Sequence, residues 1–233
     1  MIYITGDTHR DFRRVEFLCR EFTITADDVL VILGDAGINF FGDPQDASLK
    51  SELAQLPLTL LCIHGNHEMR PEKIKGYEEA RHFGGVVYRQ ALYPNLLFAK
   101  CGETYELAGK KCLVLGGAYS VDKFDRLKMN PPCWWEDEQP SDEIKKHAEA
   151  QLTEENWTVD YVFSHTCPLS DTPYEDLIFS PKSQMFIDKS TEEWLESIKN
   201  KLTYTKWYCG HFHINKPRDK MQFLYKDIIL MER

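Results

Sequence analysis

Imidazole, carboxylate and amide side chains gather in a few short segments of the chain, each directly after an apolar run. Five of the eight histidines lie in these segments. Oxygen and imidazole ligands without thiolate suit Mn²⁺, Fe or Zn²⁺ in five- or six-coordinate sites. The sequence therefore predicts a transition-metal site. The segments are Gly6-Asp7-Thr8-His9, Gly34-Asp35, Gly65-Asn66-His67-Glu68, His165 and Gly210-His211-Phe212-His213.

The number of candidate ligands exceeds what one catalytic ion with open positions needs. It fits two ions that lie roughly 3.5–4 Å apart and share a bridging carboxylate. Asp35 is the natural bridge, because it stands alone after the second apolar run. The alternatives are a structural zinc or unrelated core histidines, but structural zinc prefers four closed ligands rich in cysteine. We therefore expect two divalent transition metals, Mn²⁺ first, with Fe or Zn²⁺ as alternatives. The candidate ligands are Asp7, His9, Asp35, Asn66, His165, His211 and His213.

Apolar runs of strand length must position these groups. Residues 2–5, 29–33 and 58–63 alternate with amphipathic stretches at 12–22 and 47–56. This alternation predicts βαβ units and a parallel sheet. Open α/β sheets bind ligands beyond the carboxyl ends of their strands, so we expect the polar segments to converge at one rim.

The pattern changes after residue 84. Short strand-like runs with a turn at 108–110 indicate antiparallel strands and are compatible with a second sheet. Residues 71–83, 141–152 and 191–202 are predicted to be helical. The segment 166–190 is interpreted as a functional or covering loop, and the irregular segment 119–140 has no assigned role. The later predicted strands are 86–88, 96–99, 104–107, 111–115, 161–163, 206–209, 222–225 and 228–231.

Composition bounds the class of protein. With 233 residues, of which 42% are hydrophobic, the chain suits one α/β domain over residues 1–233. A net charge of −9 disfavours long nucleic acid and anionic membranes as partners, unless a local basic or metal site compensates. We expect no membrane span and no secretion signal. Seven scattered cysteines without a CxxC pair indicate reduced thiols in a cytoplasmic protein.

In order and spacing, the five polar segments resemble the motifs of calcineurin-like metallophosphoesterases. They span residues 6 to 213, nearly the whole chain. The resemblance implies a four-layer α/β/β/α sandwich of two mixed sheets flanked by helices. It implies a first metal held by Asp7, His9, Asp35 and His213. It implies a second metal held by Asp35, Asn66, His165 and His211.

The implied activity is a metal-dependent phosphoesterase with a phosphoester substrate. A metal-bridging hydroxide would attack a phosphomonoester or phosphodiester in line. His67 would bind no metal and would protonate the leaving oxygen, helped by Asp7 or Glu68, while Asn66 would also face the substrate. A nuclease or a protein phosphatase of the same fold is the alternative, and a scaffold without ions is a third possibility. The oligomeric state stays open.

Two departures from the family pattern affect substrate binding. Arg10 stands where many members have glycine, and residues 34–39 lack the Asp-Arg pair of a common GDxxDR motif. The missing pair weakens the protein phosphatase hypothesis and leaves the phosphate clamp unassigned. Arg10 is a candidate clamp, because a guanidinium binds phosphate bidentately, and its alternative role is a surface salt bridge.

Three neighbouring features have open roles. His64 precedes the third polar segment and is either a residue that orients a ligand or a core histidine. Lys123 and Arg126 are candidate phosphate-binding residues or ordinary solvated charges. The Cys133-Trp134-Trp135 run either stacks a base or sugar or seals an insertion.

Overall fold

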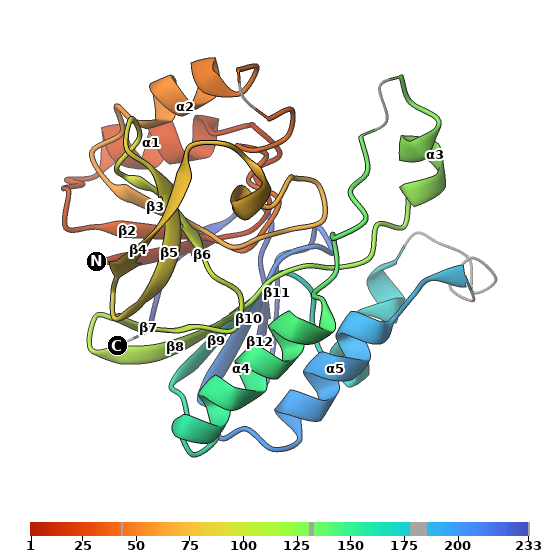
Figure 1. Ribbon diagram of the computed structural model, residues 1–233. Helices are drawn as coiled ribbons and strands as arrows, with labels where there is room; N and C mark the ends of the chain where they lie inside the picture. The colour runs from red at the N-terminus through yellow and green to blue at the C-terminus, as the bar shows by residue number, and fades with distance from the viewer. Residues whose placement is uncertain (43, 131–132, 178–185, 233) are drawn as a thin grey trace.

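The computed structural model describes residues 1–42, 44–130, 133–177 and 186–232. Two mixed β-sheets lie face to face, with α1 and α2 on one outer side and α4 and α5 on the other (Figure 1). The predicted four-layer α/β/β/α sandwich is therefore confirmed. The α-helices are α1 (Arg13–Glu21), α2 (Ala47–Leu53), α3 (Lys123–Leu127), α4 (Asp142–Glu154) and α5 (Ser190–Lys199). The 3₁₀ helices are η1 (Pro71–Lys73), η2 (Leu169–Asp171) and η3 (Tyr174–Asp176).

The first sheet has the strand order β13-β1-β2-β3-β6-β5-β4. Its centre is parallel: β1, β2, β3 and β6 run side by side in the same direction. The outer strands β13, β5 and β4 are antiparallel to their neighbours. The strands are β1 (Ile2–Thr5), β2 (Val29–Ile32), β3 (Thr59–Cys62), β4 (Tyr77–His82), β5 (Gly85–Gln90), β6 (Leu96–Ala99) and β13 (Ile228–Leu230).

The second sheet has the strand order β11-β12-β10-β9-β8-β7. Strands β12, β10, β9 and β8 are parallel, and the hairpin partners β11 and β7 close the two edges. The strands are β7 (Thr104–Leu107), β8 (Lys110–Leu115), β9 (Tyr161–Ser164), β10 (Lys206–Cys209), β11 (Lys216–Arg218) and β12 (Met221–Phe223).

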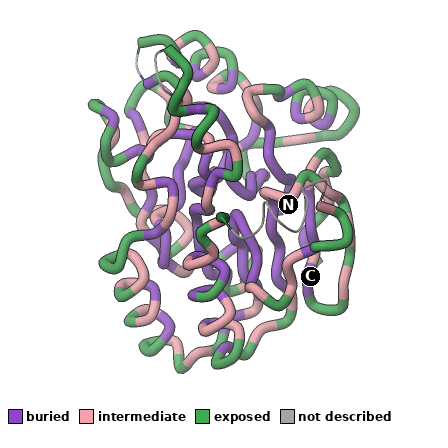
Figure 2. Tube along the Cα trace, turned by 90° about the vertical axis from the view of Figure 1, so that its right-hand side faces the viewer, coloured by how far each residue is buried: buried purple, intermediate pink, exposed green. Residues whose placement is uncertain are grey.

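Strand side chains alternate between two apolar layers, which explains the unbroken apolar runs. On β2, Val29 and Val31 enter the core between the sheets, whereas Leu30 and Ile32 pack under α1 and α2. A third cluster joins the second sheet to α4 and α5. The buried strands accordingly fill the middle of the molecule (Figure 2). Polar groups are thereby restricted to the strand ends, where the candidate ligands lie.

The predicted helix over residues 71–83 is wrong. Only η1 is helical there, and residues 77–82 form the edge strand β4. Phe83 and Gly84 both have positive φ, 53° and 82°, and make a two-residue hairpin loop to β5. Pairing along the whole strand outweighs the helix propensity of a run rich in Glu, Ala and Arg.

Other expectations have mixed outcomes. The short helix α3 and the strand β11 were not predicted. All seven cysteines are free, and Cys62, Cys112 and Cys209 are buried. Within the described residues, no helix has the length and apolarity needed to cross a bilayer. The single-domain boundary and the cytoplasmic location stay predictions.

Candidate metal centre and active site

Five strand ends bring the predicted ligands together. Strands β1, β2 and β3 are parallel neighbours in one sheet, and β9 and β10 are parallel neighbours in the other. Their carboxyl ends meet at one rim of the sandwich, as the sequence predicted. Three overlapping groups of potential metal-binding side chains lie there, each within 4.8 Å, and they contain Asp7, His9, Asp35, His67, His165 and His213.

The first group joins β1 to the loop after β10. Nε2 of His9 and Nε2 of His213 face each other at 3.0 Å. Oδ2 of Asp7 lies 3.3 Å from the His213 nitrogen and 3.8 Å from the His9 nitrogen. Two imidazoles and a carboxylate thus point their ligand atoms at one small volume, which is the arrangement that a bound cation needs.

A second ligand group, which is not one of those three, joins β3 to β9 and β10 through an amide. Oδ1 of Asn66 lies 2.7 Å from Nε2 of His165 and 3.1 Å from Nδ1 of His211. Nδ1 of His165 lies 2.8 Å from the carbonyl of Leu33, which leaves its Nε2 turned toward the site. The structure thus places the amide oxygen and both imidazoles together.

Asp35 lies between the two groups. Its Oδ2 is 4.0 Å from Nε2 of His9 and 3.6 Å from Nε2 of His165. Its Oδ1 accepts a hydrogen bond from the backbone N–H of His67 at 2.7 Å. A Cβ atom on Gly65 would lie 2.0 Å from that same oxygen, so only glycine leaves room for the carboxylate. This position supports the prediction that Asp35 bridges the two metal positions.

The backbone at the strand ends is left-handed at several non-glycine residues. The φ angles are 45° at His9, 69° at Arg10, 49° at Asp35, 65° at His211 and 53° at His213. Such conformations cost about 1–3 kcal/mol each and persist where surrounding structure holds them. Four of these five residues are candidate ligands, so the strain is concentrated at the metal centre.

Electrostatics make this rim attractive to cations. Burial by itself would raise the pKa of Asp7, but His213, His165 and His9 outweigh it and hold that pKa well below its usual value. Burial likewise acts against Asp35, whose pKa is nevertheless lowered, chiefly by His165. The site therefore contains two ionised carboxylates, each only 1% exposed.

The imidazoles differ in protonation. Burial, and then the neighbouring His165, lower the pKa of His211 to about 3, so its ring is neutral and able to bind a metal. The adjacent Asp7 carboxylate raises the pKa of His213.

The donor set suits divalent metal ions. Oδ2 of Asp7 is buried and has no hydrogen-bond partner of regular geometry among the described residues. Buried carboxylates of this kind are normally paired or bound to a metal. Oxygen and imidazole donors without thiolate suit ions such as Mn²⁺, Fe and Zn²⁺. The identity of the ions stays a prediction.

A buried network beneath Asn66 fixes the orientation of its amide. Nδ2 of Asn66 donates to Oγ of Ser120 at 2.8 Å, so the amide oxygen points at His165. Ser120 donates to the carboxylate of Glu138 through its Oγ and through its backbone N–H. Nη1 of Arg126 donates to Ser120 Oγ and to the Asn66 carbonyl, both at 3.2 Å. Arg126 was a candidate for phosphate binding or an ordinary solvated charge, whereas in the structure it is 3% exposed and supports Asn66.

The surroundings of His67 differ from the expectation. Its Nε2 lies 3.9 Å from Oδ1 of Asp122, a residue just before α3 that sequence reasoning missed. Glu68 instead accepts backbone hydrogen bonds from Gly65 and Gly37, and it has no hydrogen bond or ion pair with His67 in the described structure. This geometry gives no support to the alternative in which Glu68 helps His67, and Glu68 instead stabilises the turn. Burial, and then Asp35, raise the Glu68 pKa to about 8.

Arg10 is engaged in an ion pair. Its Nη1 lies 2.5 Å from Oδ1 of the buried Asp46 and donates to the Gly37 carbonyl at 2.7 Å. The salt bridge is thus present, and it braces the loop after β2. Phosphate binding by Arg10 stays a prediction.

A cavity of about 410 Å³ opens beside the ligands. Segment 119–140 contributes Tyr119, Val121 and Asp122 to it, and segment 166–190 contributes a second wall. Residues 131–132 and 178–185 of these segments lie outside the described part of the chain. Trp134 and Trp135 stack with Lys123 and Arg126 rather than opening to the cavity, which fits a sealing role. The second wall consists of Thr172, Asp176, Leu177, Ile187, Lys189 and Glu192.

Comparisons with known proteins agree with this geometry. No curated protein sequence matches the chain. One solved structure with some similarity is a protein of unknown function, AQ665 from Aquifex aeolicus, with 16% identity and a TM-score of 0.27 over 71% of this chain and 80% of that one. That likeness is too weak to support an argument. Residues 1–215 match the family described as calcineurin-like phosphoesterase, a range that contains every candidate ligand. The chain therefore belongs to the calcineurin-like phosphoesterase family and is a metal-dependent phosphoesterase.

Proposed function

We propose that the protein hydrolyses small phosphomonoesters or phosphodiesters with two divalent ions held at the sheet rim. The observation that carries the proposal is the position of Asp35, whose Oδ2 lies within 4.0 Å of one imidazole from each group. One ion would be held by Asp7, His9, Asp35 and His213. The other would be held by Asp35, Asn66, His165 and His211. When bound, the ions would lower the pKa of a water between them and neutralise phosphoryl charge.

The remaining chemistry belongs to His67 and its neighbours. His67 follows Asn66 and lines the cavity. Burial lowers the pKa of its imidazole, although Asp35 acts in the opposite direction. The negative charge of a bound phosphoester would favour the imidazolium, which would then donate a proton to the departing oxygen. Asp122 positions that ring, since its carboxylate lies 3.9 Å from Nε2. Val121 and Phe212 line the same cavity and would exclude water around the leaving group.

The cavity favours a small substrate over a polyanion. Its volume of about 410 Å³ lies in the range of small-molecule sites. Lys189 is the one Lys or Arg among its described lining residues, whereas Asp122, Asp176 and Glu192 are acidic. Nucleic acid binding depends on several phosphate contacts by Lys and Arg, so a nuclease is disfavoured. The lack of the Asp-Arg pair at residues 34–39 acts against a protein phosphatase.

The leaving group provides the sharpest test of His67. An alkoxide needs the donated proton, whereas p-nitrophenolate leaves well without it. We expect His67→Gln to keep its metals and to slow alkyl phosphate esters by about 10²–10⁴-fold, with a smaller effect on p-nitrophenyl esters. The assay compares kcat/KM across leaving groups of graded pKa with Mn²⁺ present, and metal content is measured in parallel.

A matched control is His82→Gln, because His82 lies on the edge strand β4 away from the ligands. It should leave the leaving-group profile unchanged. A His67 variant that loses metal, or that slows every ester equally, would show that His67 is a ligand or a charge clamp. Plasmid cleavage at least as efficient as turnover of p-nitrophenyl phosphate and bis(p-nitrophenyl) phosphate would support a nuclease instead.

A further inference from the structure

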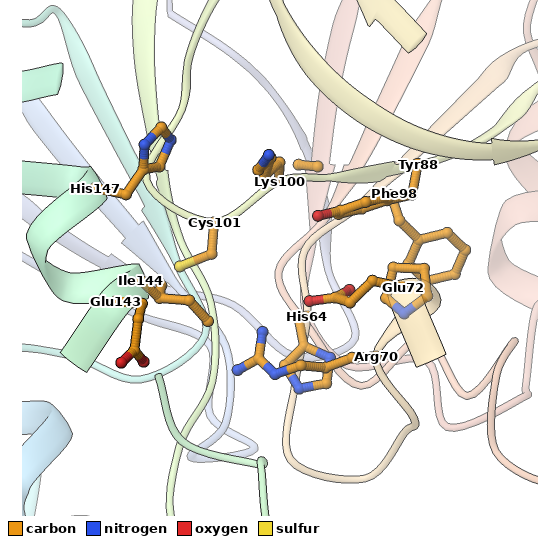
Figure 3. Close-up of a pocket in the computed structure, with 12 residues that line it drawn as sticks. His64, Arg70, Glu72, Tyr88, Phe98, Lys100, Cys101, Glu143, Ile144 and His147 are labelled. Atoms are coloured by element: carbon orange, nitrogen blue, oxygen red, sulfur yellow. The ribbon is translucent and has the colours of Figure 1, made fainter. Parts of the chain in front are cut away.

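A second cavity, of about 290 Å³, lies beside the segment that carries the metal ligand Asn66. It shares no lining residue with the cavity at the metal centre. His64 and Arg70, at the two ends of the segment 64–70, line it from one side. Figure 3 shows these two side chains near each other, with the rings of Tyr88 and Phe98 on another wall and Ile144 of α4 opposite.

The buried imidazole ring of His64 has no hydrogen-bond partner in the part of the chain that the structure describes. The residue is 4% exposed, and neither ring nitrogen has a hydrogen-bond partner within the described ranges. An imidazole always offers at least one N–H donor. Buried polar groups of folded proteins are nearly always paired, so an orphaned ring that lines a cavity indicates a missing partner there.

Arg70 is held rigidly at the same cavity. It is 5% exposed, its Nε donates to the Asp137 carbonyl at 2.9 Å, and its Nη2 donates to the Gln139 carbonyl at 3.3 Å. The Asp137 carboxylate lies 3.6 Å from Nε but is closer to Lys73, at 2.8 Å. Nη1 makes no hydrogen bond to any residue that the structure describes. A guanidinium fixed in this way presents a preformed donor to an anionic group.

The other charges at the cavity limit the ligand to one negative charge. Lys100 and His147 already have acidic partners, at 2.7 and 2.8 Å. Glu72 and Glu143 are solvent-exposed lining residues that would repel a second negative charge. Pro71, Tyr88, Phe98 and Ile144 supply apolar walls for the body of a ligand. A volume near the lower end for ligand sites favours a ligand smaller than a nucleotide.

We propose that this cavity binds a small organic monocarboxylate with an aromatic or aliphatic body. The carboxylate would accept hydrogen bonds from Arg70 and His64, and the body would pack against Tyr88 and Phe98. The proposal concerns a site separate from the metal centre and does not depend on the proposed substrate of that centre.

The test uses the full-length protein loaded with Mn²⁺ and calorimetric titration with benzoate, benzamide and inorganic phosphate. Benzoate should bind, and the uncharged benzamide should bind at least about tenfold more weakly, because it lacks the charge that Arg70 recognises. Ile144→Trp, which fills the cavity from α4, should weaken benzoate binding by at least about tenfold. Lys146→Trp is the matched control on the exposed face of the same helix and should bind benzoate like the wild type.

Arg70→Gln separates the two possible locations of a bound carboxylate. The proposal expects both Arg70→Gln and Ile144→Trp to weaken benzoate binding. A carboxylate that binds Mn²⁺ at the metal centre would respond to neither substitution. A benzoate affinity equal to that of the wild type in both variants would therefore overturn the proposal. Absence of binding heat in the wild type would mean that the cavity holds only solvent. Phosphate binding tighter than benzoate binding would overturn the assignment to a monocarboxylate. Melting temperatures of all variants establish that each is folded.

Discussion

Substitution of Gly65 tests directly whether the close approach of the segment after β3 to Asp35, after β2, holds Asp35 in the bridging position. A Cβ atom there would lie 2.0 Å from Asp35 Oδ1 and 2.3 Å from the Asp35 backbone nitrogen. Real Cβ contacts are essentially never shorter than 3.0 Å. The carboxylate must therefore retreat by about 1 Å in Gly65→Ala, and the backbone contact prevents a side-chain rotation from absorbing the whole clash.

A shift of about 1 Å in a reacting constellation can cost about 10²-fold in rate, which is about 2.7 kcal/mol in transition-state free energy. We expect Gly65→Ala to lose about that much kcat/KM on p-nitrophenyl phosphate and to bind Mn²⁺ more weakly. Overpacking should also lower the free energy of unfolding by about 1–3 kcal/mol. The assays are turnover at saturating and limiting Mn²⁺, calorimetric Mn²⁺ titration and thermal melting.

Gly109→Ala is the matched control. Gly109 lies in the β7–β8 turn with φ +73°, and its added Cβ meets nothing within 4 Å. This variant should show only the left-handed backbone strain, about 1–2 kcal/mol of stability, with normal metal binding and turnover. If Gly65→Ala keeps wild-type Mn²⁺ affinity and kcat/KM within about threefold, the close approach of Gly65 to Asp35 does not govern the site.

Three further predictions address the ions, the support of Asn66 and a buried acid. Asp35→Asn should lose both tight binding of the two ions and activity. Mn²⁺ at about 100 times its Kd should stabilise the wild type by about 2.7 kcal/mol in thermal melts and leave the stability of this variant unchanged. Full activity of the wild type after EDTA treatment would contradict the dinuclear centre. Ser120→Ala should weaken metal binding by about 10–100-fold in calorimetry, because the Asn66 amide loses its donor partner, whereas Ser48→Ala on the exposed face of α2 should have no effect. Burial raises the pKa of Glu192, whose Oε2 has no hydrogen-bond partner within the described ranges. The folded state therefore keeps a proton that the unfolded chain loses above its ordinary carboxyl pKa. The free energy of unfolding should consequently fall as pH rises through the raised folded-state pKa. Glu192→Gln cannot ionise and should melt at higher temperature than the wild type at pH 8, by about 1 kcal/mol in stability, with a smaller difference at pH 5; an equal difference at both pH values would show that ionisation of Glu192 is not the cause.

The strands and the ligand set could be predicted because their signals are local. A run such as Val29–Ile32 is buried on both faces, so its composition alone identifies a central strand. Parallel neighbours end at the same edge, and this rule brings Asp7, Asp35 and Asn66 together without further information. The features that were missed depend on strand pairing and side-chain packing that the local residue pattern does not show.

Three of these features show why the sequence was insufficient. Residues 77–82 contain good helix formers, and only their pairing with β5 makes them a strand. Asp122 precedes a five-residue helix in an irregular stretch. It lies 55 residues after His67 in the sequence, and no sequence pattern connects the two residues. The cavity at His64 exists because α4 packs near the segment 64–72, and its apolar and charged residues are scattered over four elements.

The ligand segments also hold one another in place, which affects how substitutions combine. The backbone N–H of His9 donates to the Asp35 carbonyl at 2.9 Å, and the N–H of His211 donates to Asp7 Oδ1 at 2.9 Å. The N–H of His67 in turn binds Asp35 Oδ1. Each segment is thus ordered by a neighbour that also supplies a ligand, and the left-handed backbone at these positions persists only while those neighbours are in place. Ligands at this rim therefore form one coupled unit, whose substitution energies are not expected to add, and bound ions would offset both the backbone strain and the repulsion between the buried carboxylates.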